Sequence, residues 1–457
     1  MIFKKLLAFA LASLLLFPVV GFSQSGQSKP LTLEECVQIA LQKNSSYLNA
    51  QRQARIAETQ VTSARSRLLP TLSSSFSSGR FRQGTSTFKR DVPIIDTNTG
   101  ETIGYRQLEV EQDGSVRQSH SASFTLNQTI FDFGDTYNTL KQARSNRESA
   151  FYSVDNSKQN TVLTIHQRYF ELLKNIRLLE VASEAVKSSE EQLKRTQSMF
   201  EIGSVAQADV YRAQTTLGND KISLIQQQNM VRDSRALLNV AMGRQPDAEL
   251  EIIDLEDVEA QPVYNEEEVL NIAMQNNPQI FQFKSDMNAA KYGRRAAKAA
   301  YLPVISGFAQ YSRSNSEIDR VYTNYDKNFS LNLGLRLNFN LFNGFADAAN
   351  VERQAQSYRI AEENLVNTQR ELRRQVREAL LDLQVNQEVS QINEANLQSA
   401  QEDLRLAQER YRVGAGTLLD VITAQVNLTR ARATFVQAKY NTKITEARLQ
   451  AAMGTLK

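Results

Sequence analysis

The sequence predicts an α+β membrane protein in which a unit of long antiparallel coiled-coil helices and a β-hairpin occurs twice. Three observations predict this fold class. The chain matches itself at two fixed offsets, several segments alternate apolar and polar residues over strand lengths, and two long stretches almost lack glycine and proline. A duplication of this length indicates a pseudo-symmetric molecule, which suits a ring or a tube better than an enzyme with one pocket.

Two offsets relate the copies. Glu34, Ile39 and Asn44 match Glu267, Ile272 and Asn277 at an offset of 233, whereas Gly203, Asp209 and Ala241-Met242-Gly243 match Gly414, Asp420 and Ala452-Met453-Gly454 at an offset of 211. The first copy therefore carries about 22 extra residues (233 − 211) between Pro70 and Phe131. We expect a first repeat over residues 24–245 and a second over 266–457.

The N-terminus has the order of a secretory signal peptide. Lys4 and Lys5 precede an apolar run from Leu6 to Val20, and small residues follow it, so we expect a signal peptide over residues 1–23. No other segment approaches about 18 consecutive apolar residues. If the exported chain crosses a membrane, it must therefore do so with strands.

The strand signals form one hairpin in each copy. From Phe329 to Phe342 apolar and polar residues alternate, and a partner strand follows Pro303, so the second hairpin occupies 303–342 with a polar loop over 312–327. The first hairpin occupies 71–133, with strands at about 71–83 and 120–133. Their connection, roughly 84–119, is predicted to be a long loop rich in Asp, Thr and Gly.

These strands are expected to close a barrel with strands of other chains. One face is apolar and the other carries small polar residues, which suits a water-filled lumen better than a β-sandwich. An open four-stranded sheet in lipid would leave backbone groups unpaired at both edges. Three chains of four strands give a twelve-stranded barrel, although backbone pairing alone does not select three chains over two or four.

The remaining segments are predicted to be helical. Helices over 33–69 and 266–302 precede the hairpins, and Thr32 and Glu35 have the spacing of a capping box. Long helix pairs follow the hairpins, at 135–201 with 207–242 and at 345–412 with 417–452. The tips of these pairs lie at 202–206 and 413–417, where a glycine reverses the chain. The acidic segment 246–265 is a connector outside the helical wall, in the equatorial region of the molecule.

The segments around the two helix breaks, residues 199–214 and 410–425, carry a family resemblance. Together with Ala-Met-Gly at the end of each copy and Leu-Pro before each hairpin, they resemble the TolC-like outer-membrane efflux protein family. The resemblance implies a homotrimer with a twelve-stranded barrel in the lipid of the bacterial outer membrane and a helical tunnel through the periplasm. It also implies docking to a periplasmic adaptor (membrane fusion) protein and to an inner-membrane pump or ABC secretion ATPase.

The resemblance also assigns residues to the tunnel entrance. Asp420 matches an aspartate that lines the entrance, so three copies would form an anionic ring that selects cations. Thr423 stands where some members have a second aspartate, and Tyr411 matches a tyrosine that holds the entrance closed. The alternative for Asp420 and for its counterpart Asp209 is that each is a helix N-terminal residue favoured by the helix dipole.

The tips are the expected docking points for the adaptor, with Ile202-Gly203 and Val413-Gly414 at the far periplasmic ends. Asp209, Arg410 and Arg412 are possible partners across the closed entrance. The two arginines could equally belong to a solvated helix face.

Other classes of function have little support. The net charge is +3 with acids and bases interspersed, so no nucleic-acid partner is predicted. The single Cys36 excludes an internal disulfide, and no catalytic, cofactor or metal-ligand spacing is present. The function predicted is a passive exit duct for efflux or type I secretion, carrying small molecules or proteins. The main alternative is an exported coiled-coil spacer protein without a pore.

Overall fold

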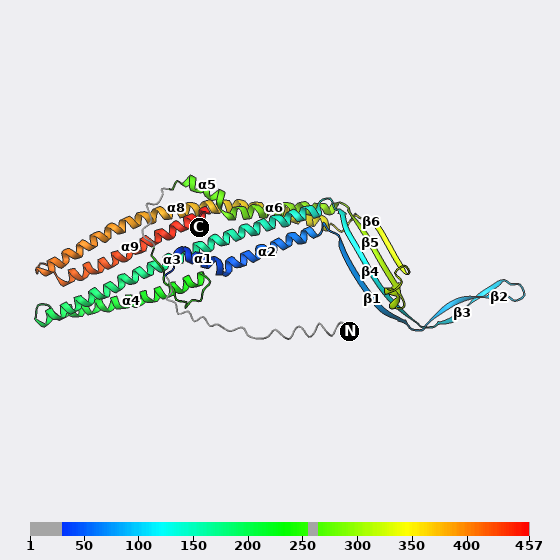
Figure 1. The fold of residues 1–457 in the computed structure, drawn as a ribbon, viewed down its shortest axis with the longest axis horizontal. Helices are drawn as coiled ribbons and strands as arrows, with labels where there is room; N and C mark the ends of the chain where they lie inside the picture. Colours follow the sequence, from blue (N-terminus) through cyan, green and yellow to red (C-terminus); the bar gives the residue numbers. More distant parts are fainter. Residues whose placement is uncertain (1–29, 255–263, 457) are drawn as a thin grey trace.

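One end of the molecule is formed by β-strands and the rest is made of long helices, which together give an elongated shape (Figure 1). The computed structural model describes residues 30–254 and 264–456. The signal peptide expected over 1–23 and the middle of the expected connector lie outside the described residues. Within the two described ranges, no helix combines the length and the apolar character that crossing a membrane requires.

The main sheet has the order β1-β4-β5-β6, and all of its pairs are antiparallel. It contains β1 (Thr71–Gln83), β4 (Ser115–Phe131), β5 (Val304–Asn315) and β6 (Phe329–Asn338). The pairing of β4 with β5 joins the two copies into one sheet. Strands β1 and β6 form its edges, so one side of each has no strand partner within the described chain.

The two faces of this sheet differ in polarity. The register places Leu126, Ala309 and Leu333 in one row, and this face is apolar. The opposite face carries rows of serine, where Ser75 bonds Ser123 at 2.8 Å and Ser77 bonds Ser121 at 2.7 Å. Because successive side chains of a strand point to opposite faces, the expected alternation gives one apolar and one polar surface.

Two expectations about the strands were wrong. The connection over 84–119 is not a loop, because it contains β2 (Ser86–Ile95) and β3 (Thr102–Gln112), which form a separate two-stranded sheet. The last strand ends at Asn338 and not at Phe342, since the chain then turns into the next helix. Gly344 (φ +67°) and Phe345 (φ +66°) make this turn in the left-handed region.

The loop expected over 312–327 is shorter and partly ordered into α7 (Asp319–Tyr322). Arg313, on β5, is buried and holds this loop. Its Nη2 lies within hydrogen-bonding distance, 2.6–3.2 Å, of four backbone carbonyl oxygens, those of Arg320, Thr323, Asn324 and Lys327. The outer connection between β5 and β6 is therefore fixed to the sheet by one side chain.

Each helix expected before a hairpin is in fact two helices. They are α1 (Leu33–Lys43) with α2 (Ser45–Ser66), and α5 (Glu266–Asn276) with α6 (Pro278–Lys298), the latter followed by the short 3-10 helix η1 (Ala299–Tyr301). Asn44 and Asn277 break them in extended conformation, and each side-chain oxygen caps the helix that follows. The expected capping box of Thr32 and Glu35 is present at the start of α1.

The long helices pair as α3 (Asp135–Glu201) with α4 (Gln207–Ala241) and as α8 (Ala346–Arg412) with α9 (Leu418–Met453). The shorter α4 and α9 cover only the half of their partners that ends at the tips. Helices α2 and α6 pack along the half nearer the sheet, as expected from their lengths (Figure 1).

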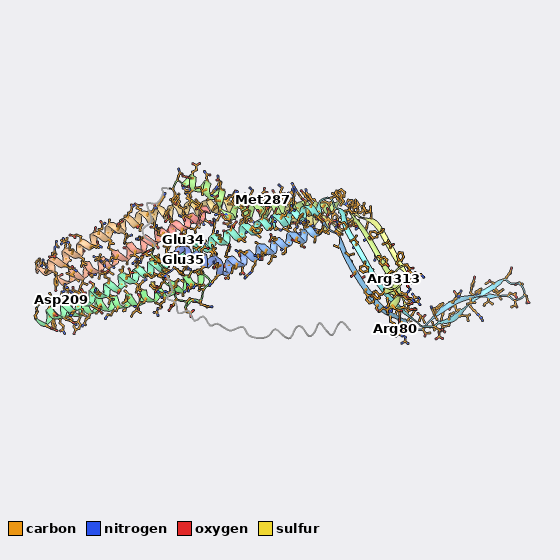
Figure 2. All side chains as sticks on the ribbon, in the orientation of Figure 1. Glu34, Glu35, Arg80, Asp209, Met287 and Arg313 are labelled. Carbon is orange, nitrogen blue, oxygen red and sulfur yellow. The ribbon has the colours of Figure 1, made fainter. Side chains whose placement is uncertain are left out.

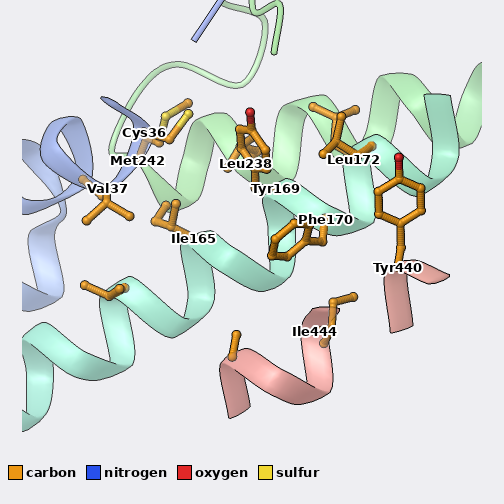
Figure 3. Packing of buried hydrophobic residues seen from close by; sticks show 14 of the residues in the cluster. Cys36, Val37, Ile165, Tyr169, Phe170, Leu172, Leu238, Met242, Tyr440 and Ile444 are labelled. Carbon is orange, nitrogen blue, oxygen red and sulfur yellow. The ribbon is translucent and has the colours of Figure 1, made fainter. Parts of the chain in front are cut away.

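The duplication is visible in two cores near the middle of the molecule. The first core contains Cys36, Ala40, Ile165, Leu172, Leu238 and Met242 (Figure 3). The second core contains the residues that match them at the two offsets, namely Val269, Ala273, Val376, Leu383, Leu449 and Met453. Burial raises the pKa of the Cys36 thiol to about 11, so this cysteine is a packing residue.

Each core is closed by the Ala-Met-Gly motif. The Asn44 side-chain amide donates to the Ala241 carbonyl oxygen at 2.9 Å, and Asn277 donates to Ala452 at 3.1 Å. The glycine that follows has a φ of +72° at Gly243 and +74° at Gly454. The motif therefore ends α4 and α9 against the breaks at Asn44 and Asn277 in the short helix pairs.

Candidate channel entrance at the helix tips

Both helix pairs reverse direction at a glycine in the left-handed region. Gly203 has a φ of +77° and Gly414 a φ of +76°. Ile202 is 77 % exposed and Val413 is 69 % exposed, so each tip presents an aliphatic side chain to its surroundings. The chain closes each turn with a backbone bond, from Ser204 to Met199 and from Ala415 to Arg410, both at 2.8 Å.

Asp420 caps the helix that leaves the second tip. The Thr417 backbone N–H donates to Asp420 Oδ2 at 2.8 Å, and the Asp420 N–H donates to Thr417 Oγ1 at 3.2 Å. The Thr417 N–H and then its hydroxyl hold the pKa of Asp420 below the ordinary value, and Arg410 contributes in the same direction. Asp420 therefore carries its negative charge at neutral pH, and the role of helix N-terminal residue is present in the single chain.

The face of α9 that carries Asp420 is not covered by other residues of the described chain. Thr423 lies one turn further on, and both Asp420 and Thr423 are exposed. Leu419 and Val426 are also exposed, whereas Val421, Ala424 and Leu428 are buried on the opposite side of the helix. The face that carries Asp420 and Thr423 is therefore available to line a lumen or to meet another copy.

Tyr411 connects the two tips. Its hydroxyl lies 3.2 Å from the sulfur of Met199, which is on α3 of the first copy. Burial raises the pKa of Tyr411, and the nearby Asp209 carboxylate raises it further. Asp209 itself pairs with Arg212 at 3.2 Å in the first turns of α4, at the end of the molecule shown in Figure 2. The structure thus brings Tyr411 and Asp209 together.

The two arginines expected as gate partners behave differently. Arg412 forms an ion pair with Glu409 at 2.8 Å on its own helix, which matches the alternative of a solvated face. Arg410 lies close enough to Asp420 to lower the pKa of that carboxyl group. Among the described residues, neither arginine forms an ion pair with the other helix pair.

A cavity of about 370 Å³ separates the two helix pairs above the tips. Its walls come from α3, α4 and α9, with Gln408 of α8. The lining residues include the apolar Ala185, Ala213 and Val421 and the polar Gln192 and Gln425. The helix pairs are therefore not packed tightly against each other here, which leaves α9 room to shift relative to α3.

A cluster that the sequence did not predict joins the two copies on the side of this cavity that faces away from the tips. Asp254 accepts from Arg177 Nε at 2.9 Å and Nη2 at 2.6 Å, and from the Tyr440 hydroxyl at 2.9 Å. Arg177 is on α3, Tyr440 is on α9, and Asp254 is in the segment that follows the first repeat. We name Asp254, Arg177 and Tyr440 the inter-repeat cluster. Burial raises the pKa of Tyr440 to about 12, so its hydroxyl stays protonated and donates.

The segment that carries Asp254 is itself held in place. Leu31 and Ile252 form a parallel bridge. The Tyr169 hydroxyl donates to the carbonyl oxygen of Ile253 at 2.5 Å and lies 3.2 Å from that of Leu31. Leu380 stands at the position that matches Tyr169 in the second copy, so this anchor belongs to the first copy. No regular spacing in the sequence relates Asp254 to its partners.

We expect Asp254→Ala and Tyr440→Phe to be non-additive in their effect on the unfolding free energy. Each removes the bond between the two side chains, so the double variant should lose it only once, with a coupling on the order of 1 kcal/mol. The value stays modest because Arg177 and Asp254 are partly exposed. Thermal denaturation in detergent measures it, with the exposed Asp247→Ala as the control in the same segment. Strict additivity would show that the contact contributes nothing.

Comparison with known proteins places these features in a family. A family model described as outer membrane efflux protein matches residues 36–244 and 269–455, that is, one segment in each copy. The outer membrane protein TolC of Escherichia coli (strain K12) is 27 % identical over 369 residues, which cover 77 % of this chain and 72 % of that protein. The outer membrane efflux protein BepC of Brucella suis is 22 % identical over 457 residues, covering 100 % and 92 %.

Solved structures show the same fold. The Campylobacter jejuni CmeC outer membrane channel aligns with a TM-score of 0.79 at 19 % identity, covering 93 % of this chain and 85 % of that one. The open-state MtrE outer membrane channel of Neisseria gonorrhoeae aligns with a TM-score of 0.76, covering 93 % and 89 %. The α+β fold class predicted from the sequence is confirmed. With its two tips, its amphipathic main sheet and both repeats matched by the family model, the chain belongs to the outer membrane efflux protein family.

Proposed function

We propose that three copies of this chain form an exit duct in the bacterial outer membrane, through which substrates leave the periplasm. The observation that carries the proposal is the four-stranded sheet with one apolar face, one serine-rich face and two open edges. In lipid these edges require further strands, and identical copies supply them through β1 and β6. Three copies would give twelve strands, with polar side chains facing the lumen.

We propose the following organisation for the whole chain. Residues 1–23 direct export and are removed. The repeats over 24–245 and 266–457 each supply one strand pair and one long helix pair, and residues 246–265 connect them. The helices would form the periplasmic part of the duct, with the tips farthest from the membrane. We propose no catalytic step, cofactor or metal for this duct.

The periplasmic entrance would be formed by the exposed face of α9. Three copies of Asp420 would give an anionic ring, flanked by Thr423, which supplies no second charge. Tyr411 and Asp209 would hold the entrance in its resting position through contacts between the two tips, and Arg410 would act beside Asp420 within the second tip. Opening would move α9 outward against its neighbouring helices, into the room that the cavity between the helix pairs leaves.

We propose that the tips are the docking points for a periplasmic adaptor, which would connect the duct to an inner-membrane pump or an ABC secretion ATPase. Ile202 and Val413 are exposed at the two tips and are aliphatic, so they offer apolar contacts to the end of an adaptor. The alternative function, a coiled-coil spacer without a pore, would need neither the serine-rich sheet face nor two similar tips.

Reconstitution in planar lipid bilayers tests the duct. The purified full-length protein should migrate as a heat-modifiable oligomer in electrophoresis and should produce discrete conductance steps. Extraction with the outer membrane would accompany this result. A soluble monomer without conductance would instead support the spacer protein.

Asp420→Asn should weaken block of the single-channel current by divalent cations at least about tenfold. The variant removes the charge of a group whose interaction with a cation is worth about 1.5–3 kcal/mol, and tenfold corresponds to 1.4 kcal/mol. Thr417→Val is the matched control, because it removes the hydroxyl of the cap and keeps the carboxylate. An Asp420→Asn channel with unchanged block would rule out a dominant Asp420 ring.

A further inference from the structure

The extra residues of the first copy form a structure that the exit duct does not explain. They build the hairpin of β2 and β3, which lies beyond the main sheet and extends the molecule along its longest axis (Figure 1). Arg80 and Arg313 mark the end of the main sheet from which it projects (Figure 2). The second copy has only the short loop with α7 at the corresponding place.

The hairpin is joined to the main sheet at a close bend. Gly84 lies between β1 and β2, and Gly114 lies between β3 and β4, so each of the two connecting segments has a glycine at the bend. A Cβ at Gly114 would lie 2.7 Å from the backbone oxygen of Gln83, so only glycine permits this approach. The bend fixes where the hairpin leaves the sheet, and an assembled barrel would place every copy of it at the same rim.

The two faces of the hairpin differ in chemistry. The register pairs Phe88 with Val110, Arg90 with Leu108, Val92 with Arg106 and Ile94 with Gly104. These residues share one face, which we name the apolar-basic face, because alternate residues of a strand point to the same side. Phe88 is 47 % exposed and Ile94 is 40 % exposed, although both are large apolar side chains.

The opposite face is acidic. It carries Thr87 opposite Glu111, Lys89 opposite Glu109, Asp91 opposite Gln107 and Pro93 opposite the 71 % exposed Tyr105, and we name it the acidic face. Three carboxylates and one ammonium group give it a net charge of −2, against +2 from the two arginines of the apolar-basic face. The two faces of one hairpin are therefore complementary in charge.

The hairpin has little support from its own chain. Among the elements that the structure describes, β2 and β3 pack mainly on each other. A lone two-stranded hairpin is marginally stable in water, particularly with apolar side chains exposed. A further surface is needed to cover the apolar-basic face.

We propose that this surface is the acidic face of the same hairpin in the neighbouring subunit, so that three hairpins form a ring beyond the outer end of the barrel. In a cyclic trimer each contact joins two different patches of identical chains, and the two faces supply such a pair. Arg90 and Arg106 would then meet Asp91, Glu109 and Glu111 of the neighbouring copy, around the buried apolar side chains. The inference rests on the proposed trimer.

Disulfide trapping in the full-length protein tests this arrangement. The variant carries Val92→Cys on the apolar-basic face and Gln107→Cys on the acidic face. These side chains point to opposite sides of one hairpin, so they cannot pair within a chain. Cys36 is buried with a raised pKa and stays unreactive. Oxidation of outer membranes should give covalent dimers and trimers that survive boiling, whereas each single-cysteine variant should remain monomeric after boiling.

Charge reversal provides the second measurement. Arg90→Glu with Arg106→Glu should slow cross-linking about tenfold, and adding Glu109→Arg with Glu111→Arg should restore it. A heat-modifiable trimer that shows no cross-link would overturn the ring and leave the duct intact. Cross-linking by Val92→Cys alone would overturn it too, since like faces would then meet. Absence of any trimer would count against the duct itself.

Discussion

Leu333→Arg should prevent stable assembly of the protein in the outer membrane. Leu333 lies in the middle of β6 on the apolar face, opposite Ala309, and is 69 % exposed in the single chain. In the proposed barrel this face contacts lipid, where an arginine near the midplane costs about 2–4 kcal/mol in each subunit. Heat-modifiable migration of outer-membrane extracts measures the effect, and the oligomer band should be lost or strongly reduced.

Asn332→Arg is the matched control for this variant. It places the same side chain at the adjacent position of the same strand, where it points to the polar face beside Gln310. A wet lumen accepts the charge, so assembly should be retained and the single-channel conductance should change instead. Equal loss of assembly in both variants would contradict the assignment of the two faces.

Gly243→Ala should destabilise the protein more than any other single methyl group added in α4 or at its ends. A Cβ at this position would lie 2.5 Å from the Lys43 carbonyl oxygen, and the φ of +72° is unfavourable for alanine. The left-handed conformation costs about 1–2 kcal/mol. Displacement of the end of α1 adds about 1–3 kcal/mol. Together the two costs should lower the midpoint temperature of thermal denaturation, measured on the purified protein in detergent.

Two glycines of the same helix pair, at the tip and inside α4, separate these contributions. Gly203 has a similar φ of +77° with no atom within 4 Å of an added Cβ, so Gly203→Ala should show only the conformational cost. Gly218 lies in the interior of α4 without a positive φ or a close neighbour, so Gly218→Ala should stabilise by about 0.5–1 kcal/mol. If Gly243→Ala were as mild as Gly203→Ala, the contact with α1 would have no energetic role.

Local signals in the sequence were sufficient for the main elements. Alternation of apolar and polar residues predicted β4, β5 and β6, because a strand exposes opposite faces at successive residues. The long helices were predicted closely, and Gly203 and Gly414 marked their tips, because a left-handed turn favours glycine. The repeat offsets also anticipated the two matching cores.

Other features escaped prediction although they were local. Asn44 and Asn277 interrupt the short helices without any change in the helical pattern, and Pro278 was the one local sign of a break. Strands β2 and β3 lie among the Thr, Gly and Asp residues that suggested a loop, so their pairing could not be read from composition.

By itself, the sequence determined the duplicated unit, the reversal points and the amphipathic strands, since each of these depends on residues that are close along the chain. Only the tertiary structure decided which distant groups meet. Arg177, Asp254 and Tyr440 come from three separate segments, and Tyr411 reaches Met199 across the two copies. Such contacts follow from how the long helices pack side by side, and no periodicity within one helix records the register of its neighbour.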